Sequence, residues 1–61
     1  MSTEDEINKL EAELEFVQNE INRRHERIDN GVDPARNHDK IDELRVKKRA
    51  LQERLAKLRE A

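Results

Sequence analysis

Two histidines are the residues of this chain with the most versatile chemistry near neutral pH. His25 and His38 lie on either side of the single glycine, Gly31, with Asp29, Asp39 and Asp42 close by in the sequence. Two imidazoles and a carboxylate resemble a partial zinc site, and two facing imidazoles would repel each other when acid protonates both. No HExxH or other dedicated ligand spacing is present. We therefore favour two ordinary solvated histidines and expect no metal or cofactor, with zinc binding and pH sensing as the alternatives.

Basic residues in the second half of the chain suggest a different chemistry, which is contact with phosphates. Residues 45–49 read Arg-Val-Lys-Lys-Arg, and clusters of Lys and Arg often bind nucleic acids. On a helix these side chains point in different directions, and no aromatic residue accompanies them to stack on bases. We favour a solvated helical face and keep nucleic-acid contact as an alternative, through Arg36, Arg45, Arg49 and Lys57.

Catalysis is not expected from this sequence. The chain has no Cys, Tyr or Trp, and its only hydroxyl side chains are those of Ser2 and Thr3. An active site needs a concave pocket that excludes water from the reacting groups. The elements predicted below form a rod, so we expect a protein that is not an enzyme.

Composition limits the class of fold. The chain has 61 residues, of which 46% are charged and 33% hydrophobic, with one Gly, one Pro and one Phe. This bias is typical of coiled coils and long helices, whereas an equally charged chain without periodicity would be disordered. No apolar run approaches the roughly 20 residues that span a bilayer. We therefore expect a cytoplasmic protein that does not associate with membranes.

Apolar residues recur at alternating steps of three and four on both sides of residues 30–34. Such spacing predicts an apolar stripe on each of two helices. The stripes are mirror images, because the residue numbers of each facing pair add to 65. These pairs are Ile7 with Leu58, Leu10 with Leu55, Leu14 with Leu51, Ile21 with Leu44, and Arg24 with Ile41. The mirror point lies inside the turn, so the sequence predicts an all-α antiparallel helical hairpin, which is a two-helix coiled coil.

The ends of the two helices have recognisable signals. Residues 3–6 form a capping box that begins at Thr3, and Gly31 is the left-handed residue that ends the first helix. Asp33 is expected to cap the second helix with Pro34 at its first position, and a start at Asn37 is the alternative. The predicted boundaries of this single hairpin are a first helix over about 4–30, a turn at 31–33 and a second helix over about 34–60.

Positions a and d of the heptad form the predicted seam, with Ile7 at position a. Three polar residues also lie on it, namely Arg24, Asn37 and Lys48. We expect them to fix the register and oligomeric state at some cost in stability, with their long stems along the seam. Apart from Asn37, the predicted seam consists of Ile7, Leu10, Leu14, Val17, Ile21, Arg24, Ile28, Ile41, Leu44, Lys48, Leu51, Leu55 and Leu58.

Charge is distributed unevenly between the two arms. Residues 1–33 carry four Lys or Arg and ten Asp or Glu, whereas residues 34–61 carry nine and five. Such arms attract each other when they lie side by side. An antiparallel pair places g opposite g and e opposite e, which predicts pairs of Glu13 with Arg54, Glu20 with Lys47, and Glu4 with Arg59. For the polar seam residues, the expected partners are Glu20 or Asp42 for Arg24, and Glu13 or Glu20 for Lys48.

A single seam buries little apolar surface in a chain of this length, so we expect a second layer. Its simplest source is a homodimer that forms a four-helix bundle. Phe16 lies off the seam at position c and comes level with Ala50. Together with Ala12 and Val46 it predicts a small apolar patch, which is either a core position of the homodimer or a docking site for another protein.

The preferred functional hypothesis is a non-catalytic protein–protein interaction module, such as a small adaptor, inhibitor or regulatory subunit of a larger protein. The alternative is a dimeric nucleic-acid-binding hairpin that uses the basic face of the second helix. A remote alternative rests on Asp29 and Asp33 beside the turn. A hairpin with an acidic tip resembles the bacterial transcript-cleavage factors in architecture, which implies action on RNA polymerase, although the sequence has no counterpart of their globular second domain. The plan also resembles small plasmid-encoded RNA-binding hairpins that dimerise, without a shared motif.

Overall fold

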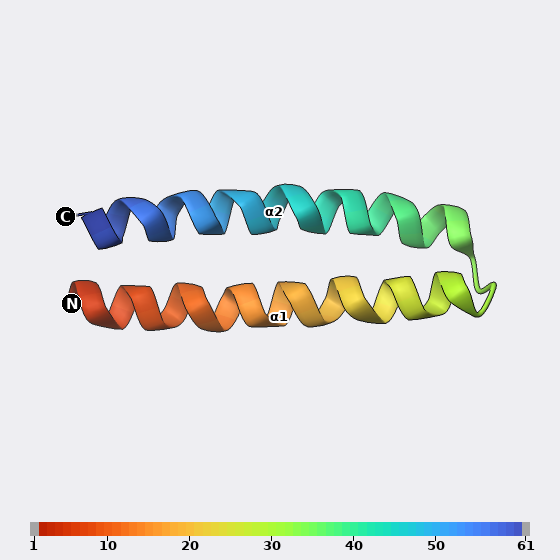
Figure 1. The fold of residues 1–61 in the computed structure, drawn as a ribbon, viewed down its shortest axis with the longest axis horizontal. Coiled ribbons are helices and arrows are strands. Elements are labelled where there is room, and N and C mark those ends of the chain that lie inside the picture. Colours follow the sequence, from red (N-terminus) through yellow and green to blue (C-terminus); the bar gives the residue numbers. More distant parts are fainter. Residues whose placement is uncertain (1, 61) are drawn as a thin grey trace.

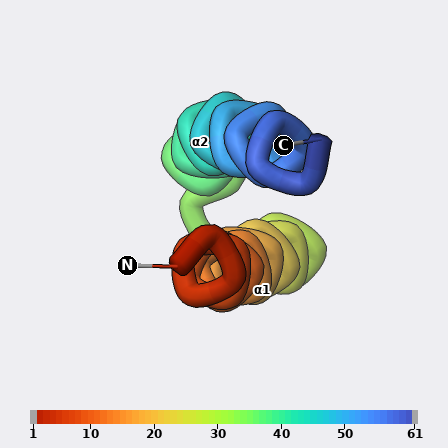
Figure 2. Tube along the Cα trace, turned by 90° about the vertical axis from the view of Figure 1, so that its left-hand side faces the viewer, coloured from red at the N-terminus to blue at the C-terminus, as the bar shows by residue number. Residues whose placement is uncertain are grey.

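Two long helices make up the structure. The computed structural model describes residues 2–60, in which α1 spans Thr3–Asp29 and α2 spans Pro34–Glu60. The helices run antiparallel and side by side, so that the start of α1 and the end of α2 lie at the same end of a rod (Figure 1). Viewed along the rod, the two helices form a single pair (Figure 2). The predicted all-α helical hairpin is thus confirmed, with Cα extents of 44 × 15 × 14 Å.

The first helix begins with a cap at Ser2. Ser2 has the extended backbone of an N-cap residue, with φ −83° and ψ 153°, and its Oγ accepts a hydrogen bond from the Asp5 N–H at 3.2 Å. The predicted capping box of Thr3 and Glu6 is therefore wrong. A capping residue must precede the first helical residue, and Thr3 is already helical. The Glu6 carboxylate instead pairs with Arg54 of α2 at 2.9 Å.

A Schellman motif ends α1. Asn30 is the C-cap residue, and Gly31 adopts the left-handed backbone with φ 77°. The Gly31 N–H donates to Ile28 O and the Val32 N–H donates to Arg27 O, both at 2.9 Å. These two bonds satisfy carbonyl groups that the helix end would otherwise leave unpaired. The left-handed stop that the sequence predicts at Gly31 is confirmed.

The α2 helix begins at Pro34, so the alternative start at Asn37 is wrong. The side chain that holds its first turn is nevertheless that of Asn37, and not that of Asp33. Asp33 O accepts the first helical hydrogen bond from the Asn37 N–H at 3.0 Å, but the Asp33 carboxylate makes no hydrogen bond within residues 2–60. Its φ of 39° lies in the left-handed region, whereas a capping side chain needs an extended backbone. The predicted Asp33 cap is therefore wrong. The Asn37 side-chain amide instead donates to Val32 O at 2.7 Å and to Asp33 O at 3.1 Å.

The seam between the helices holds the apolar core. Its buried hydrophobic side chains are Leu10, Val17, Ile21, Ile41 and Leu55. Half-buried hydrophobic side chains extend the core along the rod, namely Ile7, Leu14, Ile28, Leu44, Leu51 and Leu58. Arg24 and Lys48 are also half-buried. Every described apolar seam residue therefore loses much of its water contact, while the surfaces beside the seam stay open for other roles.

Candidate functional site

The hairpin has two flanks, one on each side of the plane that contains both helices. Positions g and c lie on one flank, and positions e and b lie on the other. We call the first the Phe16 flank; its central part consists of Lys9, Glu13, Phe16 and Glu20 of α1 with Lys47, Ala50 and Arg54 of α2. We call the second the histidine flank; it includes Glu11, Gln18 and His25 of α1 with His38, Arg45, Gln52 and Arg59 of α2. These flanks are the surfaces on which the seam leaves side chains exposed.

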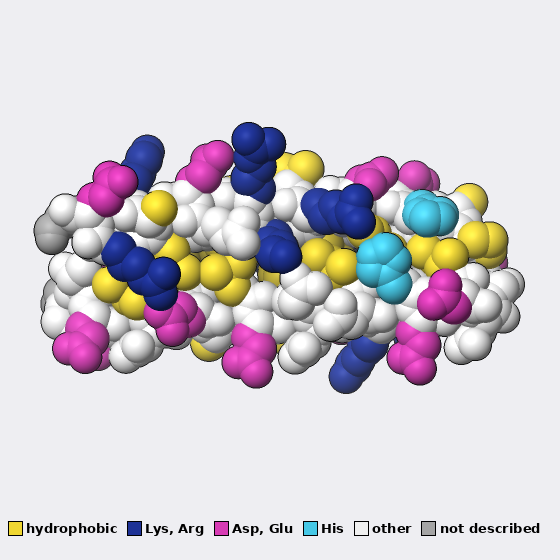
Figure 3. Space-filling model, viewed as in Figure 1, with side chains coloured by type: hydrophobic (Ala, Val, Ile, Leu, Met, Phe, Trp, Pro, Cys, Tyr) yellow, Lys and Arg dark blue, Asp and Glu magenta, His cyan; other side chains and the backbone are white. Residues whose placement is uncertain are grey.

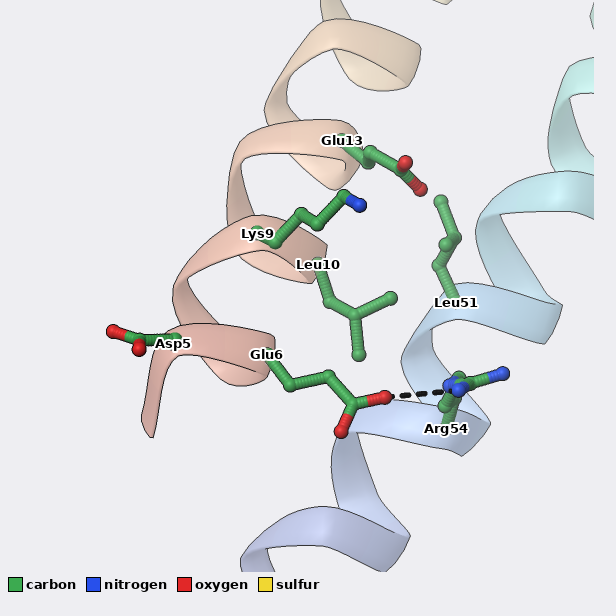
Figure 4. Close-up of a pocket in the computed structure, with 7 residues that line it drawn as sticks. All are labelled: Asp5, Glu6, Lys9, Leu10, Glu13, Leu51 and Arg54. Carbon is green, nitrogen blue, oxygen red and sulfur yellow. Dashed lines mark hydrogen bonds and ion pairs between the residues drawn. The ribbon is translucent and has the colours of Figure 1, made fainter. Parts of the chain in front are cut away.

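An open groove runs along the Phe16 flank near the free ends of the helices. Leu10 and Leu51 approach each other across it, while Glu6 and Arg54 form the ion pair drawn beside them (Figure 4). The groove continues along α1 over a stretch lined by Lys9, Ala12, Glu13, Phe16, Val17 and Lys47. Phe16 is 65% exposed at this stretch. The groove therefore combines an apolar floor with charged rims and an exposed aromatic ring.

The four residues of the predicted apolar patch are divided between the two helices. Ala12 and Phe16 line the groove on α1, whereas Ala50 and Val46 of α2 do not line it. All four are exposed, and Val46 is 72% exposed. Charged g residues, Glu13 on α1 and Lys47 on α2, lie between the two halves. The patch is therefore not one continuous apolar surface on a single hairpin.

Phe16 and Ala50 are nevertheless level with each other along the rod. Lys48 Nζ donates to Gln18 Oε1 across the seam at 2.5 Å. Two residues further along each antiparallel helix, towards the free ends, the chain reaches Phe16 on α1 and Ala50 on α2. This level is close to the middle of both helices.

A buried polar network joins α1, the turn and α2. Asn37 is 4% exposed, and its Oδ1 accepts a hydrogen bond from Arg24 Nη1 at 3.1 Å. The predicted partners of Arg24, Glu20 or Asp42, are therefore wrong. Because the Asn37 amide also donates to two turn carbonyls, both of its N–H groups and one of the two lone pairs of Oδ1 are used. Arg24 Nε is buried without a hydrogen-bond partner within residues 2–60. The sequence places both residues on the seam but does not reveal that they bind each other.

The ion pairs across the seam differ from the predicted ones. The observed pairs are Arg54 with Glu6 at 2.9 Å and Arg59 with Glu11 at 2.6 Å. The predicted partners, Glu13 and Glu4, stand on the same rows but one heptad away. Glu20, predicted to meet Lys47, pairs with Arg23 of its own helix at 3.5 Å. The bond of Lys48 to Gln18 likewise replaces the predicted contacts with Glu13 or Glu20. Long side chains reach along the rod, so facing positions alone do not determine their partners.

The basic residues considered for nucleic-acid contact do not share one flank. Arg45 and Arg49 occupy positions e and b, on the histidine flank, whereas Arg36 and Lys57 occupy position c, on the Phe16 flank. Arg49 also pairs with Glu53 at 3.6 Å. A nucleic-acid backbone is bound by cations that follow one path. This arrangement divides the four charges between two surfaces.

Both histidines are exposed on the histidine flank, one on each helix and towards the turn end of the rod (Figure 3). Over residues 2–60, no group of three or more His, Asp or Glu side chains is placed to hold a metal ion. Two imidazoles supply half of the four ligands of a structural zinc site.

Further from the turn, the Arg59 to Glu11 pair crosses this flank over a hollow that Leu14 and Leu55 help to line.

The acidic residues beside the turn are both exposed. Asp29 is the last residue of α1, and Asp33 immediately precedes α2. Neither carboxylate takes part in an ion pair within the described part of the chain. The remote hypothesis of action on RNA polymerase stays a prediction.

Neither described helix is long and apolar enough to cross a membrane.

Comparison with known proteins identifies no relative from which a function could be transferred. No protein-family model matches the chain, no curated protein matches it, and no solved structure matches it.

Proposed function

We propose that this hairpin is a non-catalytic protein-interaction module that binds another helical surface through its Phe16 flank. The exposure of Phe16 is the observation that carries the proposal. It is the only aromatic residue of the chain, and it stays 65% exposed beside a groove with an apolar floor. Aromatic anchors next to apolar grooves are typical of the centres of protein interfaces.

The small size of the core also supports a role in association. Of residues 2–60, five hydrophobic side chains are buried in a rod with an accessible surface of 5004 Å². Chains of this length bury a small share of their surface when they fold alone. A partner that covers the Phe16 flank would add a second apolar layer, and full burial of Phe16 alone would contribute about 1.5 to 3 kcal/mol.

The shape of the surface supports binding more than catalysis or nucleic-acid contact. The grooves of the described rod are open along its length, whereas catalysis depends on a site that excludes water. A nucleic-acid interface has weaker support, because its four candidate cations are divided between the two flanks.

A photoreactive side chain at position 16 tests the proposed function. Replacement of Phe16 by benzoylphenylalanine should give covalent protein products on illumination, because the ring lies where the partner binds. The matched control carries the same group at Asn8, an exposed residue at position b on the histidine flank. The yield should change little between 50 and 200 mM salt, since phosphate contacts, unlike apolar ones, weaken steeply over that range. Products with nucleic acid, or protein products no more abundant than those from position 8, would contradict the proposal.

A further inference from the structure

We infer that the occupant of the Phe16 flank is a second copy of this chain, packed so that both turns lie at the same end of a four-helix bundle. The inference rests on the proposed function, because it names the partner of the same flank. Two symmetric arrangements are possible when two copies meet through this flank. With the two-fold axis along the rod, α1 of each copy packs on α2 of the other and the turns share one end. With the axis across the rod, α1 packs on α1 of the second copy, α2 packs on α2 of the second copy, and the turns lie at opposite ends.

Side-chain size favours the arrangement with both turns at the same end. Phe16 and Ala50 occupy position c at the same level of the rod. When α1 of one copy lies on α2 of the other, each Phe16 faces the Ala50 of the second copy, and this contact occurs twice. The opposite-end arrangement would bring Phe16 onto Phe16 and Ala50 onto Ala50. Facing large and small side chains fill an interface evenly, whereas the second arrangement crowds one contact and leaves the other empty.

Charges in the g row around Phe16 favour the same arrangement. Glu13 and Glu20 stand on α1, and Lys47 and Arg54 stand on α2. With the turns at one end, the acids of each copy face the bases of the other. With the turns at opposite ends, acids face acids and bases face bases. Facing charges of opposite sign favour one orientation and one partner, whereas facing charges of the same sign repel and destabilise the interface.

Two of these four charges have no ion-pair partner within a single hairpin. Within residues 2–60, neither Glu13 nor Lys47 takes part in an ion pair, whereas Glu20 pairs with Arg23 and Arg54 pairs with Glu6. In the register that brings Phe16 onto Ala50, Glu13 comes level with Arg54 of the second copy and Lys47 comes level with Glu20 of the second copy, so each gains an oppositely charged neighbour across the interface. Like charges meet one heptad or more from Phe16, where long side chains can turn towards solvent. These pairs are Lys9 with Lys57 and Arg27 with Lys40, and Lys9 lines the same stretch of groove as Phe16.

The flank is large enough for a stable dimer. The Cα extents give a rod 44 Å long and 15 Å wide, and side chains add to both. A flank of this size can supply the approximately 800 Å² that each partner buries in a standard interface. Among residues 2–60, the histidine flank has no exposed large hydrophobic side chain at its e and b positions, whereas the Phe16 flank has Phe16. An ion pair between the helices crosses each flank, Arg59 with Glu11 on the histidine flank and Arg54 with Glu6 on the Phe16 flank.

The distance between the two turns distinguishes the arrangements. The chain contains no cysteine, so Asn30→Cys places one nitroxide label on each turn. Pulsed electron resonance should give a label distance below about 30 Å, since neighbouring helices in a bundle are about 8 to 10 Å apart. The opposite-end arrangement predicts more than about 40 Å, because about 14 residues at 1.5 Å each separate position 30 from the level of Phe16 in both copies.

A steric variant tests the contact itself. Ala50→Arg should raise the dimer dissociation constant at least about 100-fold, because the new side chain occupies the space of Phe16 from the second copy. Ala50 is exposed in the single hairpin, so the helicity of the monomer should not change. Ala56→Arg is the matched control, since Ala56 is exposed on the same helix but lies at position b on the histidine flank. It should change the dissociation constant by less than about threefold.

Sedimentation equilibrium on the same samples completes the test. A dimer that Ala50→Arg disrupts and that shows the short turn distance supports the inference. A monomer at all concentrations up to millimolar would overturn it, and the proposed function would still stand if position 16 cross-links to a different protein. A dimer with the long distance would overturn the arrangement. A dimer that Ala50→Arg leaves intact would overturn the inference, and protein cross-links from position 16 that do not exceed those from position 8 would overturn the proposed function.

Discussion

The two flanks of the hairpin share one seam and one length but present different chemistry to a partner. The Phe16 flank has an exposed aromatic ring, an open groove, and two charges, Glu13 and Lys47, without ion-pair partners within residues 2–60. The histidine flank has two exposed imidazoles and is crossed by the Arg59 to Glu11 pair. Seam residues in positions a and d build the rod and are covered by doing so. The residues at the flank positions therefore determine which side of the hairpin can bind a partner. Substitutions on the seam, on each flank and in the turn test this difference.

The largest effect should come from the seam, since both flanks depend on it. Ile41 is 2% exposed in the central cluster, so Ile41→Ala should lower the free energy of unfolding by about 2 to 5 kcal/mol. Thermal unfolding followed by circular dichroism measures this change. Val46→Ala is the control, because Val46 is 72% exposed, and it should change the same quantity by less than about 0.5 kcal/mol. Equal effects of the two substitutions would show that the seam described here is not the core.

Phe16→Ala should show which of the two flanks contributes to association. It should weaken association at least about 100-fold while leaving the free energy of unfolding of the monomer within about 0.5 kcal/mol. His25→Ala on the histidine flank should change the association constant by less than about twofold. Sedimentation over a wide concentration range gives both values. If His25→Ala weakened association as much as Phe16→Ala, the distinction between the flanks would fail.

The turn network should have the next effect, because it fixes how the helices present both flanks. Asn37→Ala removes hydrogen bonds to Val32 O and Asp33 O and the acceptor for Arg24, so it should lower the free energy of unfolding by about 2 kcal/mol. Asp33→Gly should change it by less than about 1 kcal/mol, since the Asp33 carboxylate makes no hydrogen bond within residues 2–60 and glycine accepts the left-handed backbone at this position. Denaturation with urea measures both. A loss for Asp33→Gly as large as that for Asn37→Ala would indicate that the Asp33 side chain caps α2 after all.

The smallest effect should come from the ion pair that crosses the histidine flank. Both side chains of the Arg59 to Glu11 pair are about half exposed, so water and salt screen their attraction. Arg59→Ala should lower the free energy of unfolding by less than about 1 kcal/mol at physiological salt and should not alter association. A clear loss of association in this variant would move the binding surface to the histidine flank.

Much of the hairpin follows from the sequence because its main determinants are local or periodic. The repeat of apolar residues predicts the seam, and Gly31 supplies the backbone that only glycine adopts easily at a left-handed turn. The sequence does not distinguish the cap at Ser2 from one at Thr3, because Ser and Thr are both good capping residues. Which of the two residues caps α1 depends on whether the helix begins at residue 3 or at residue 4, and it begins at Thr3.

Partners of long side chains and conformations within the turn are less predictable. Arg54 and Arg59 bind acids one heptad from the predicted ones, since flexible stems reach several positions on a row. The backbone of Asp33 depends on how four turn residues close the chain, and no residue type alone reveals it. The Arg24 to Asn37 bond likewise depends on that closure. The sequence does indicate Phe16 as a surface residue, because position c lies outside the seam.

Fluorine NMR of Phe16 tests most directly whether its flank is the binding surface. Phe16 is the only phenylalanine, so incorporation of 4-fluorophenylalanine gives a single resonance. Between micromolar and millimolar protein, we expect this resonance to shift and to lose its sensitivity to exchange of H₂O for D₂O, as the ring passes from 65% exposed to covered. A resonance that keeps the same shift and the same sensitivity to water throughout, in samples that sedimentation shows to be assembled, would contradict the account.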